Sequence, residues 1–183
     1  MSSWQQYARM SNEELERQNL AAVNLACAEA LPGINSSAIS RSLDAIERTS
    51  EKVRWLTLRQ FRAFDRRPED YHGSREYFRT LCLITVLQRD CGIRYNLSVI
   101  DETVPFTPAE SFIHGALIGE GGSCATMPVV YAAVGRSLGY PIKLVSAKGE
   151  RFTHLFARWD EEKKWVQLIP QHGFQTASVK VKG

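Results

Sequence analysis

The stretch Gly119-Glu120-Gly121-Gly122-Ser123-Cys124 runs directly into the apolar segment 125–138, and this junction decides how the chain folds. Small residues before Cys124 let the backbone pass close to a bound group, because glycine has no Cβ to clash. Apolar residues then recur at the three-and-four spacing of a buried helical stripe: Met127, Val130, Tyr131, Val134 and Leu138. The sequence therefore predicts a helix behind a glycine-rich loop, with Cys124 in its first turn.

Both ends of this helix carry recognisable signals. Ser123 is a suitable N-cap, Gly139 a suitable stop, and Pro141 prevents continuation. The unpaired N–H groups and the positive dipole end at the start of a helix lower the pKa of a thiol placed there. Such a position suits a nucleophilic cysteine, although a free cysteine more often only fills space in a core. A phosphate-binding loop is excluded, because no Lys-Ser or Lys-Thr follows the glycines.

The composition is that of an ordinary globular domain. A chain of 183 residues suits one domain with a full-sized core. Its formal net charge of +3 is too small to indicate a nucleic acid or an anionic membrane as partner. The densest basic run, Arg59 to Arg67, is interpreted as a solvated helix end, with a polyanion site as the alternative. No apolar run approaches membrane-spanning length, and the N-terminal residues lack a hydrophobic signal core.

The cysteines argue against a structural metal. Cys27, Cys82, Cys91 and Cys124 are scattered and form no Cys-x-x-Cys pair, so zinc ligation has little support. We expect reduced thiols in a cytoplasmic protein, which is compatible with one of them being reactive. We expect no metal and no organic cofactor, and no calcium-ligand cluster is visible in the sequence.

The hydrophobic period changes along the chain. Residues 1–92 predict helices from Ser11 to about Pro32, from Ser36 to Arg67 with a break near Thr49-Ser50, and from Ser74 to Cys91. Residues 93–108 are irregular, with a doubtful strand at Leu97–Val99. After the Cys124 helix the period falls to two, which predicts strands at 142–147, 152–159 and 165–169 and a frayed fourth at 179–181. Helices followed by antiparallel strands predict an α+β fold, with 1–183 as a single domain and 93–183 as its core.

Four histidines are candidates for the base that activates Cys124: His72, His114, His154 and His172. His154 lies within the second predicted strand, where it shares a face with Phe156 and Arg158. A strand packed beside the Cys124 helix could bring imidazole and thiol together, which is the nucleophile-plus-base arrangement of acyl transfer. A histidine without a chemical role is the ordinary alternative.

Three segments in this order resemble the transglutaminase-like superfamily: Gly121–Cys124 opening a helix, Arg136–Pro141 closing it, and Thr153–Trp159. The resemblance spans about residues 120–170, under a third of the chain. It implies the papain-like Cys-His-Asp architecture, in which the cysteine helix packs on a small antiparallel sheet. Cys124 would be the nucleophile and His154 the general base. Arylamine N-acetyltransferases share the Gly-Gly-x-Cys element, but Glu120 stands where they carry arginine.

The third member of the triad departs from the family pattern. The family carries an aspartate on the next strand, after a tryptophan and just before a proline, and Ile169 stands there in this chain. Isoleucine cannot accept a hydrogen bond from imidazole. Gln171 is predicted to orient His154 as a neutral acceptor, as Asn does in papain-like proteases. Gln167 and His172 are further candidates.

An oxyanion hole would need the backbone N–H of Cys124 and one donor from upstream. Asn96 and His114 are both candidates for that donor, and the sequence does not choose between them. Asp160 is too distant to serve His154, since six strand residues span about 20 Å.

The leading hypothesis is therefore a transglutaminase-like cysteine hydrolase or acyltransferase that acts on an amide or peptide bond, with a peptide or protein as substrate. Hydrolysis is expected rather than cross-linking. The alternative is a catalytically impaired scaffold that serves as a binding module through its helical part, 1–92, and Ile169 favours it. Nucleic acid and membrane partners are not expected, and the oligomeric state stays open.

Overall fold

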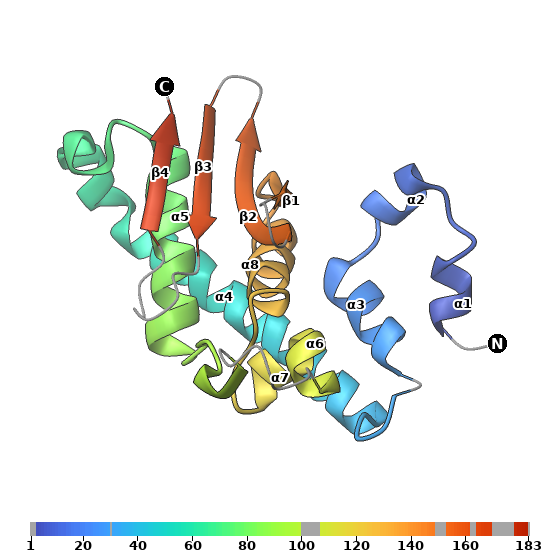
Figure 1. Ribbon diagram of the computed structural model, residues 1–183. Helices are drawn as coiled ribbons and strands as arrows, with labels where there is room; N and C mark the ends of the chain where they lie inside the picture. The colour runs from blue at the N-terminus through green and yellow to red at the C-terminus, as the bar shows by residue number, and fades with distance from the viewer. Residues whose placement is uncertain are drawn as a thin grey trace.

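The computed structural model describes residues 3–29, 31–99, 107–148, 153–161, 164–169 and 178–182. Helices precede an antiparallel sheet, which confirms the α+β class (Figure 1). The helical elements are α1 (Ser3–Tyr7), α2 (Asn12–Glu16), α3 (Leu20–Ala28), α4 (Ser36–Arg66), η1 (Pro68–Tyr71), α5 (Arg75–Thr85), η2 (Val86–Asp90), η3 (Leu97–Val99), α6 (Pro108–Ser111), α7 (Ile113–Ile118) and α8 (Thr126–Ser137). The strands are β1 (Ile142–Lys148), β2 (Thr153–Glu161), β3 (Lys164–Ile169) and β4 (Ser178–Lys182).

Helix α8 lies at the centre of the core. Every residue from Thr126 to Gly135 is buried. The helix packs against α3, α4, α5 and α7 and against strands β1 and β2. A helix that is apolar all round belongs in the interior, so the predicted stripe underestimates its burial. At Gly135 a Cβ atom would lie 2.3 Å from Cδ1 of Ile142, so glycine allows β1 to approach α8 closely.

The C-terminal end of α8 is closed by backbone hydrogen bonds. Gly139 has φ +75°. Its N–H donates to the Arg136 carbonyl at 2.9 Å, and the Tyr140 N–H donates to the Gly135 carbonyl at 3.0 Å. These are the two bonds of a Schellman motif, which needs a left-handed residue after the helix. The predicted stop at Gly139 is confirmed.

The sheet is a meander in the order β1-β2-β3-β4 with antiparallel neighbours. Its four predicted strands are confirmed to within two residues at each end. Ile142 pairs with Trp159, and both side chains are only 1% exposed within the core that surrounds α8. Alternation along β2 places Leu155, Ala157 and Trp159 on this core side.

The first predicted helix is wrong as a single element. Ser11 and Glu14 form the expected capping box, but α2 ends at Glu16 and α3 begins at Leu20. The physical reason is a second cap, because the Asn19 side chain accepts from the Ala22 N–H at 3.1 Å. An amide at this position offers the chain a new helix start.

The predicted break in the second helix is also wrong, since α4 is continuous for 31 residues. Ser50 donates to the Ile46 carbonyl at 2.8 Å and also bonds the hydroxyl of Ser137 in α8. Thr49 lies 3.5 Å from the sulfur of Cys91. Tertiary partners therefore satisfy the hydroxyls that would otherwise compete with the helical backbone.

Two smaller elements differ from the expected ones. The helix predicted to Cys91 changes to the π-helix η2 after Thr85, and the doubtful strand at residues 97–99 is the 3-10 helix η3. In η3 the side chain of Asn96 accepts from the Ser98 N–H at 3.1 Å, which closes a turn in place of a strand.

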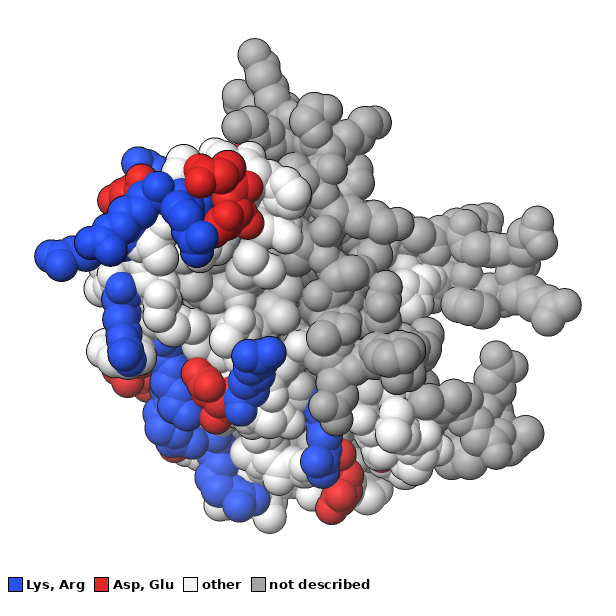
Figure 2. Space-filling model, turned by 90° about the vertical axis from the view of Figure 1, so that its left-hand side faces the viewer, with Lys and Arg blue, Asp and Glu red and all other residues white. Residues whose placement is uncertain are grey.

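The carboxyl-terminal half of α4 presents exposed basic side chains together with exposed Trp55 and Leu58. The Arg59 guanidinium lies over the Trp55 ring, 4.9 Å from its centroid. Arg67 forms an ion pair with Asp70 at 3.1 Å. Figure 2 shows Lys and Arg side chains on this side of the molecule interrupted by Asp and Glu.

Candidate active site

The glycine-rich loop before Cys124 is held between two parts of the chain. The Gly122 N–H donates to the Arg94 carbonyl at 2.9 Å, and the Asn96 N–H donates to the Gly122 carbonyl at 2.8 Å. These bonds make a parallel bridge between Tyr95 and Gly122. On the other side, the Gly121 N–H donates to the Gly115 carbonyl of α7 at 3.2 Å. The backbone two residues before the thiol is therefore fixed.

Gly121 is required by both conformation and space. Its φ is +131°, a region that L side chains rarely adopt. A Cβ atom there would lie 2.9 Å from the Arg94 carbonyl oxygen and 3.0 Å from the Asn96 nitrogen. This explains in structural terms why a small residue occurs here.

Ser123 organises the start of α8 from a fully buried position. Its hydroxyl donates to the Glu110 carbonyl at 2.7 Å and accepts from the Ala125 and Thr126 N–H groups at 3.2 and 3.4 Å. The Thr126 hydroxyl in turn accepts from the Ser123 N–H at 2.8 Å. The side chain thus accepts from the N–H groups at the start of the helix, but the N-cap position is Ala125, two residues after the predicted Ser123.

Cys124 lies in the turn that immediately precedes α8, two residues before the helix begins at Thr126, whereas the sequence predicted it inside the first helical turn. The Met127 N–H donates to the Ser123 carbonyl at 3.0 Å, which is the first bond of helical type. Pro128 has no N–H, so it cannot donate to the carbonyl of Cys124. The missing bond delays the regular helix to Thr126, and the half-buried thiol stays at its mouth.

Tyr95 contacts Cys124, which the sequence did not predict. Its hydroxyl interacts with the backbone N–H and the thiol of Cys124. Burial raises the pKa of Tyr95, and the negative charge of a Cys124 thiolate raises it further. No local spacing signals this contact, because it depends on the bridge between Tyr95 and Gly122, which lie far apart in the chain.

The two predicted oxyanion donors, Asn96 and His114, have different surroundings. The amide oxygen of Asn96 accepts from both the N–H and the hydroxyl of Ser98, at 3.1 and 2.8 Å. His114 is buried in α7, and its Nδ1 has no hydrogen-bond partner. Burial lowers the pKa of His114, which the carboxylate of Glu110 partly opposes. His114 is therefore held as the neutral imidazole at neutral pH.

His154 lies near the start of β2, paired with Ala147 of β1, and is half-buried. It shares its face with Phe156 and Arg158, opposite to the core face of the strand. Strand β2 packs on α8 through its other face, so the alternation by itself does not direct His154 toward Cys124. The pairing of His154 with Cys124 stays a prediction.

Two positions considered for the third triad member, Gln167 and Ile169, lie on β3. Ile169 is the last residue of β3 and pairs with Ser178. Gln167 pairs with Arg158, which lies four residues after His154 along β2. Gln171 and His172 lie outside the described residues, so the predicted role of Gln171 also stays a prediction. Asp160 forms an ion pair with Arg158 at 2.8 Å.

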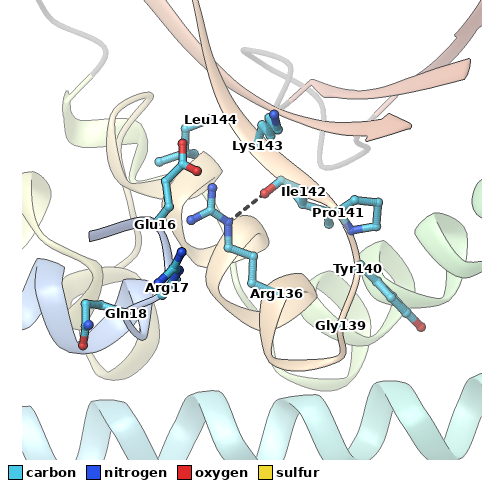
Figure 3. Close-up of a pocket in the computed structure, with 10 residues that line it drawn as sticks. All are labelled: Glu16, Arg17, Gln18, Arg136, Gly139, Tyr140, Pro141, Ile142, Lys143 and Leu144. Carbon is cyan, nitrogen blue, oxygen red and sulfur yellow. Dashed lines mark hydrogen bonds between the residues drawn. The ribbon is translucent and has the colours of Figure 1, made fainter. Parts of the chain in front are cut away.

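A pocket of about 500 Å³ opens at the other end of α8 (Figure 3). It is formed between the connection that follows α2 and the turn from α8 into β1. The Arg136 Nε donates to the Ile142 carbonyl at 2.8 Å, which fixes the guanidinium at this pocket. Its lining is Glu16, Arg17, Gln18, Arg136, Gly139, Tyr140, Pro141, Ile142, Lys143 and Leu144. About twelve helical residues separate it from Cys124, roughly 18 Å along the axis.

Among the described residues, no three His, Cys, Asp or Glu side chains gather in a group that could hold a metal ion. No described helix combines the length and the apolar character needed to cross a membrane. All four cysteines are free, with Cys27 exposed, Cys82 buried, and Cys91 and Cys124 half-buried.

No protein-family model, curated protein or solved structure matches this chain.

Proposed function

We propose that the protein is a transglutaminase-like cysteine hydrolase or acyltransferase in which Cys124 forms an acyl-enzyme with an amide or peptide substrate. The observation that carries the proposal is the presentation of a half-buried thiol at the mouth of α8, with the Tyr95 hydroxyl against it. The loop that presents the thiol is fixed on both sides by backbone hydrogen bonds. Rigid support of this kind is what a reacting group needs.

The proposed reaction uses groups near the start of α8. The sulfur of Cys124 attacks the substrate carbonyl carbon, and His154 takes the thiol proton. The C–N bond breaks, and His154 returns that proton to the departing amine. Water or an acceptor amine then attacks the thioester, which releases the acyl product and restores the thiol. In this proposal the Cys124 N–H donates to the oxygen on which negative charge develops, because the Ala125 and Thr126 N–H groups already bond the Ser123 hydroxyl.

A papain-like core is part of this proposal. A buried helix preceded by a cysteine and packed on an antiparallel sheet supports it. Gln171 is proposed to orient His154, since Ile169 cannot. A neutral amide stabilises an imidazolium less than a carboxylate does, so the proposed enzyme acts more slowly than a full triad.

The proposal is tested with p-nitrophenyl acetate, a small activated ester that needs no specific substrate pocket. We expect a burst of p-nitrophenolate and an acetyl group on Cys124, mapped by mass spectrometry. Cys124→Ala should remove the burst, and His154→Ala should slow it by about 10²–10⁴-fold. Cys91→Ala is the matched control, because Cys91 is also half-buried. Acetylation that prefers Cys27 or Cys91, or that ignores His154→Ala, would contradict the proposal.

The second candidate is a scaffold that has lost catalysis and binds a partner through its helical part. Ile169, at the end of β3, is the residue that favours it. In that case Cys124 should show no preferential acetylation, while the protein stays folded by circular dichroism. Restoration of a burst by Ile169→Asp would identify an impaired enzyme.

A further inference from the structure

The position of Tyr95 is fixed by the same bonds that fix the loop before Cys124. Its neighbours Arg94 and Asn96 each bond to Gly122, one through a carbonyl and one through an N–H. The Tyr95 ring is partly buried against the core that surrounds α8. The side chain therefore leaves a rigid backbone and packs against the core, so its hydroxyl is held close to Cys124.

This hydroxyl contacts two groups that an acyl-transfer site uses for different purposes. The thiol is the nucleophile, and the N–H of the nucleophilic residue is the usual first donor of an oxyanion hole. A reacting carbonyl group must lie about 3 Å from both. The Tyr95 oxygen already interacts with both, so it marks the place of the substrate oxygen.

We propose that Tyr95 is the second donor of the oxyanion site and that its hydroxyl holds the place of the substrate oxygen in the resting protein. This inference rests on the proposed acyl transfer at Cys124. Before reaction, the hydroxyl oxygen accepts from the Cys124 N–H and its proton points to the sulfur. The incoming carbonyl oxygen replaces it at the N–H, and the hydroxyl then donates to that oxygen.

No covalent change at Tyr95 is needed. The phenol keeps its proton throughout, because it only donates a hydrogen bond while the C–S bond forms and the C–N bond breaks. The raised pKa of Tyr95 keeps the hydroxyl protonated at neutral pH. The role therefore asks for a neutral donor, and the Tyr95 hydroxyl is a neutral donor in contact with both the Cys124 N–H and the thiol.

The test compares two reactions of the same thiol. Acetylation by p-nitrophenyl acetate passes through an oxyanion, whereas alkylation by iodoacetamide displaces iodide and forms none. For Tyr95→Phe we expect acetylation of Cys124 to slow by about 10²–10³-fold, the usual effect of losing one oxyanion donor. Alkylation should change by less than about threefold, because thiol access and ring packing are kept. Thermal unfolding and circular dichroism verify that the variant folds.

Tyr131→Phe is the matched control, since Tyr131 is a buried tyrosine of α8 whose hydroxyl accepts from Gln88 at 3.0 Å. It should alter neither rate. Tyr95→Gln supplies an N–H donor without a ring, so its acetylation should exceed that of Tyr95→Phe when each is divided by alkylation. If Tyr95→Gln folds but Tyr95→Phe does not, the ratio of acetylation rate to alkylation rate in Tyr95→Gln should lie within about tenfold of the parent ratio. A larger loss in this ratio contradicts the proposal.

Each remaining outcome overturns the inference. Equal loss of both rates in Tyr95→Phe would mean that the hydroxyl acts on the thiol alone. A rise in both rates would mean that Tyr95 only shields the sulfur, and no change would mean that it has no part. A parent protein that is never acetylated at Cys124 removes the proposed function and this inference together, whereas an acetylated parent with an unaffected Tyr95→Phe removes only this inference.

Discussion

The two ends of helix α8 are built in different ways. At the amino end, the fully buried Ser123 hydroxyl accepts from the Ala125 and Thr126 N–H groups and donates to the Glu110 carbonyl of α6. At the carboxyl end, the backbone of Gly139 and Tyr140 closes the helix without any side chain. The charged pocket shown in Figure 3 opens at this second end. The pocket and the candidate chemistry therefore lie at opposite ends of one helix.

This difference has a physical origin. The acceptor of the first N–H groups, Ser123, is local. The carbonyls of Glu110, Arg94 and Gly115 that hold Ser123 and its loop come from other segments, so the amino end must be assembled by tertiary structure. A Schellman turn is local and leaves the surrounding surface free to vary. No cysteine lines the pocket at the carboxyl end.

The largest expected effect separates the two glycines that flank the helix. Gly121→Ala should reduce the free energy of unfolding by about 2–5 kcal/mol, because it combines a positive φ with backbone contacts under 3.1 Å. Gly139→Ala has φ +75° but nothing within 4 Å of the added Cβ, so about 1–2 kcal/mol is expected. Urea unfolding of both variants measures the difference. Equal losses would mean that the amino end is no more constrained than the carboxyl end.

The next effect concerns the pH dependence of the amino end. Burial lowers the pKa of His114 below the ordinary value of 6.5, so the unfolded chain binds a proton that the folded one excludes. Stability is therefore complete above about pH 6.5 and falls as the pH drops below it, by at most about 1.4 kcal/mol per pH unit for one proton. Glu110 faces this imidazole and opposes the shift.

His114→Gln isolates that contribution. The loss of stability between pH 6.5 and 5.5 in urea titrations should be smaller in the variant than in the parent, and His72→Gln is the control because His72 is exposed. An identical pH slope in parent and His114→Gln would show that His114 does not stay neutral in the folded protein.

The smallest effect is expected at the carboxyl end. Arg136→Gln loses the bond from Nε to the Ile142 carbonyl, worth about 0.5–1.5 kcal/mol. Acetylation of Cys124 should be unchanged, since the guanidinium lies a helix length away from the thiol. Thermal unfolding and the burst assay measure both. A slower burst in Arg136→Gln would show that the two ends are coupled.

The sequence predicts the elements that depend on local chemistry. The stop at Gly139 follows from one residue type, and the strands follow from the change in period. The α4 helix shows the limit, because Ser50 reads as a breaker until its partner Ser137 is known. Tertiary hydrogen bonds decide such positions, and a single sequence does not display them.

The candidate site also has parts that local sequence predicts and parts that depend on tertiary contacts. Cys124 and its loop are recognisable because small residues and a helix start are local features. Tyr95 is not, since its contact with the thiol requires a bridge to Gly122. The partner of His154 is the part still open to experiment, because Gln171 lies outside the described residues.

The central position of α8 also has a consequence for synthesis on the ribosome. Helix α3 ends at Ala28 and packs on α8, which begins at Thr126, about one hundred residues later. Because the ribosome adds roughly 5–20 residues per second, the apolar faces of α3 and α4 stay uncovered for about 5–20 seconds until α8 is synthesised. During that interval the nascent chain exposes aggregation-prone surface, and production at low temperature or with a chaperone that shields apolar segments should raise the soluble yield.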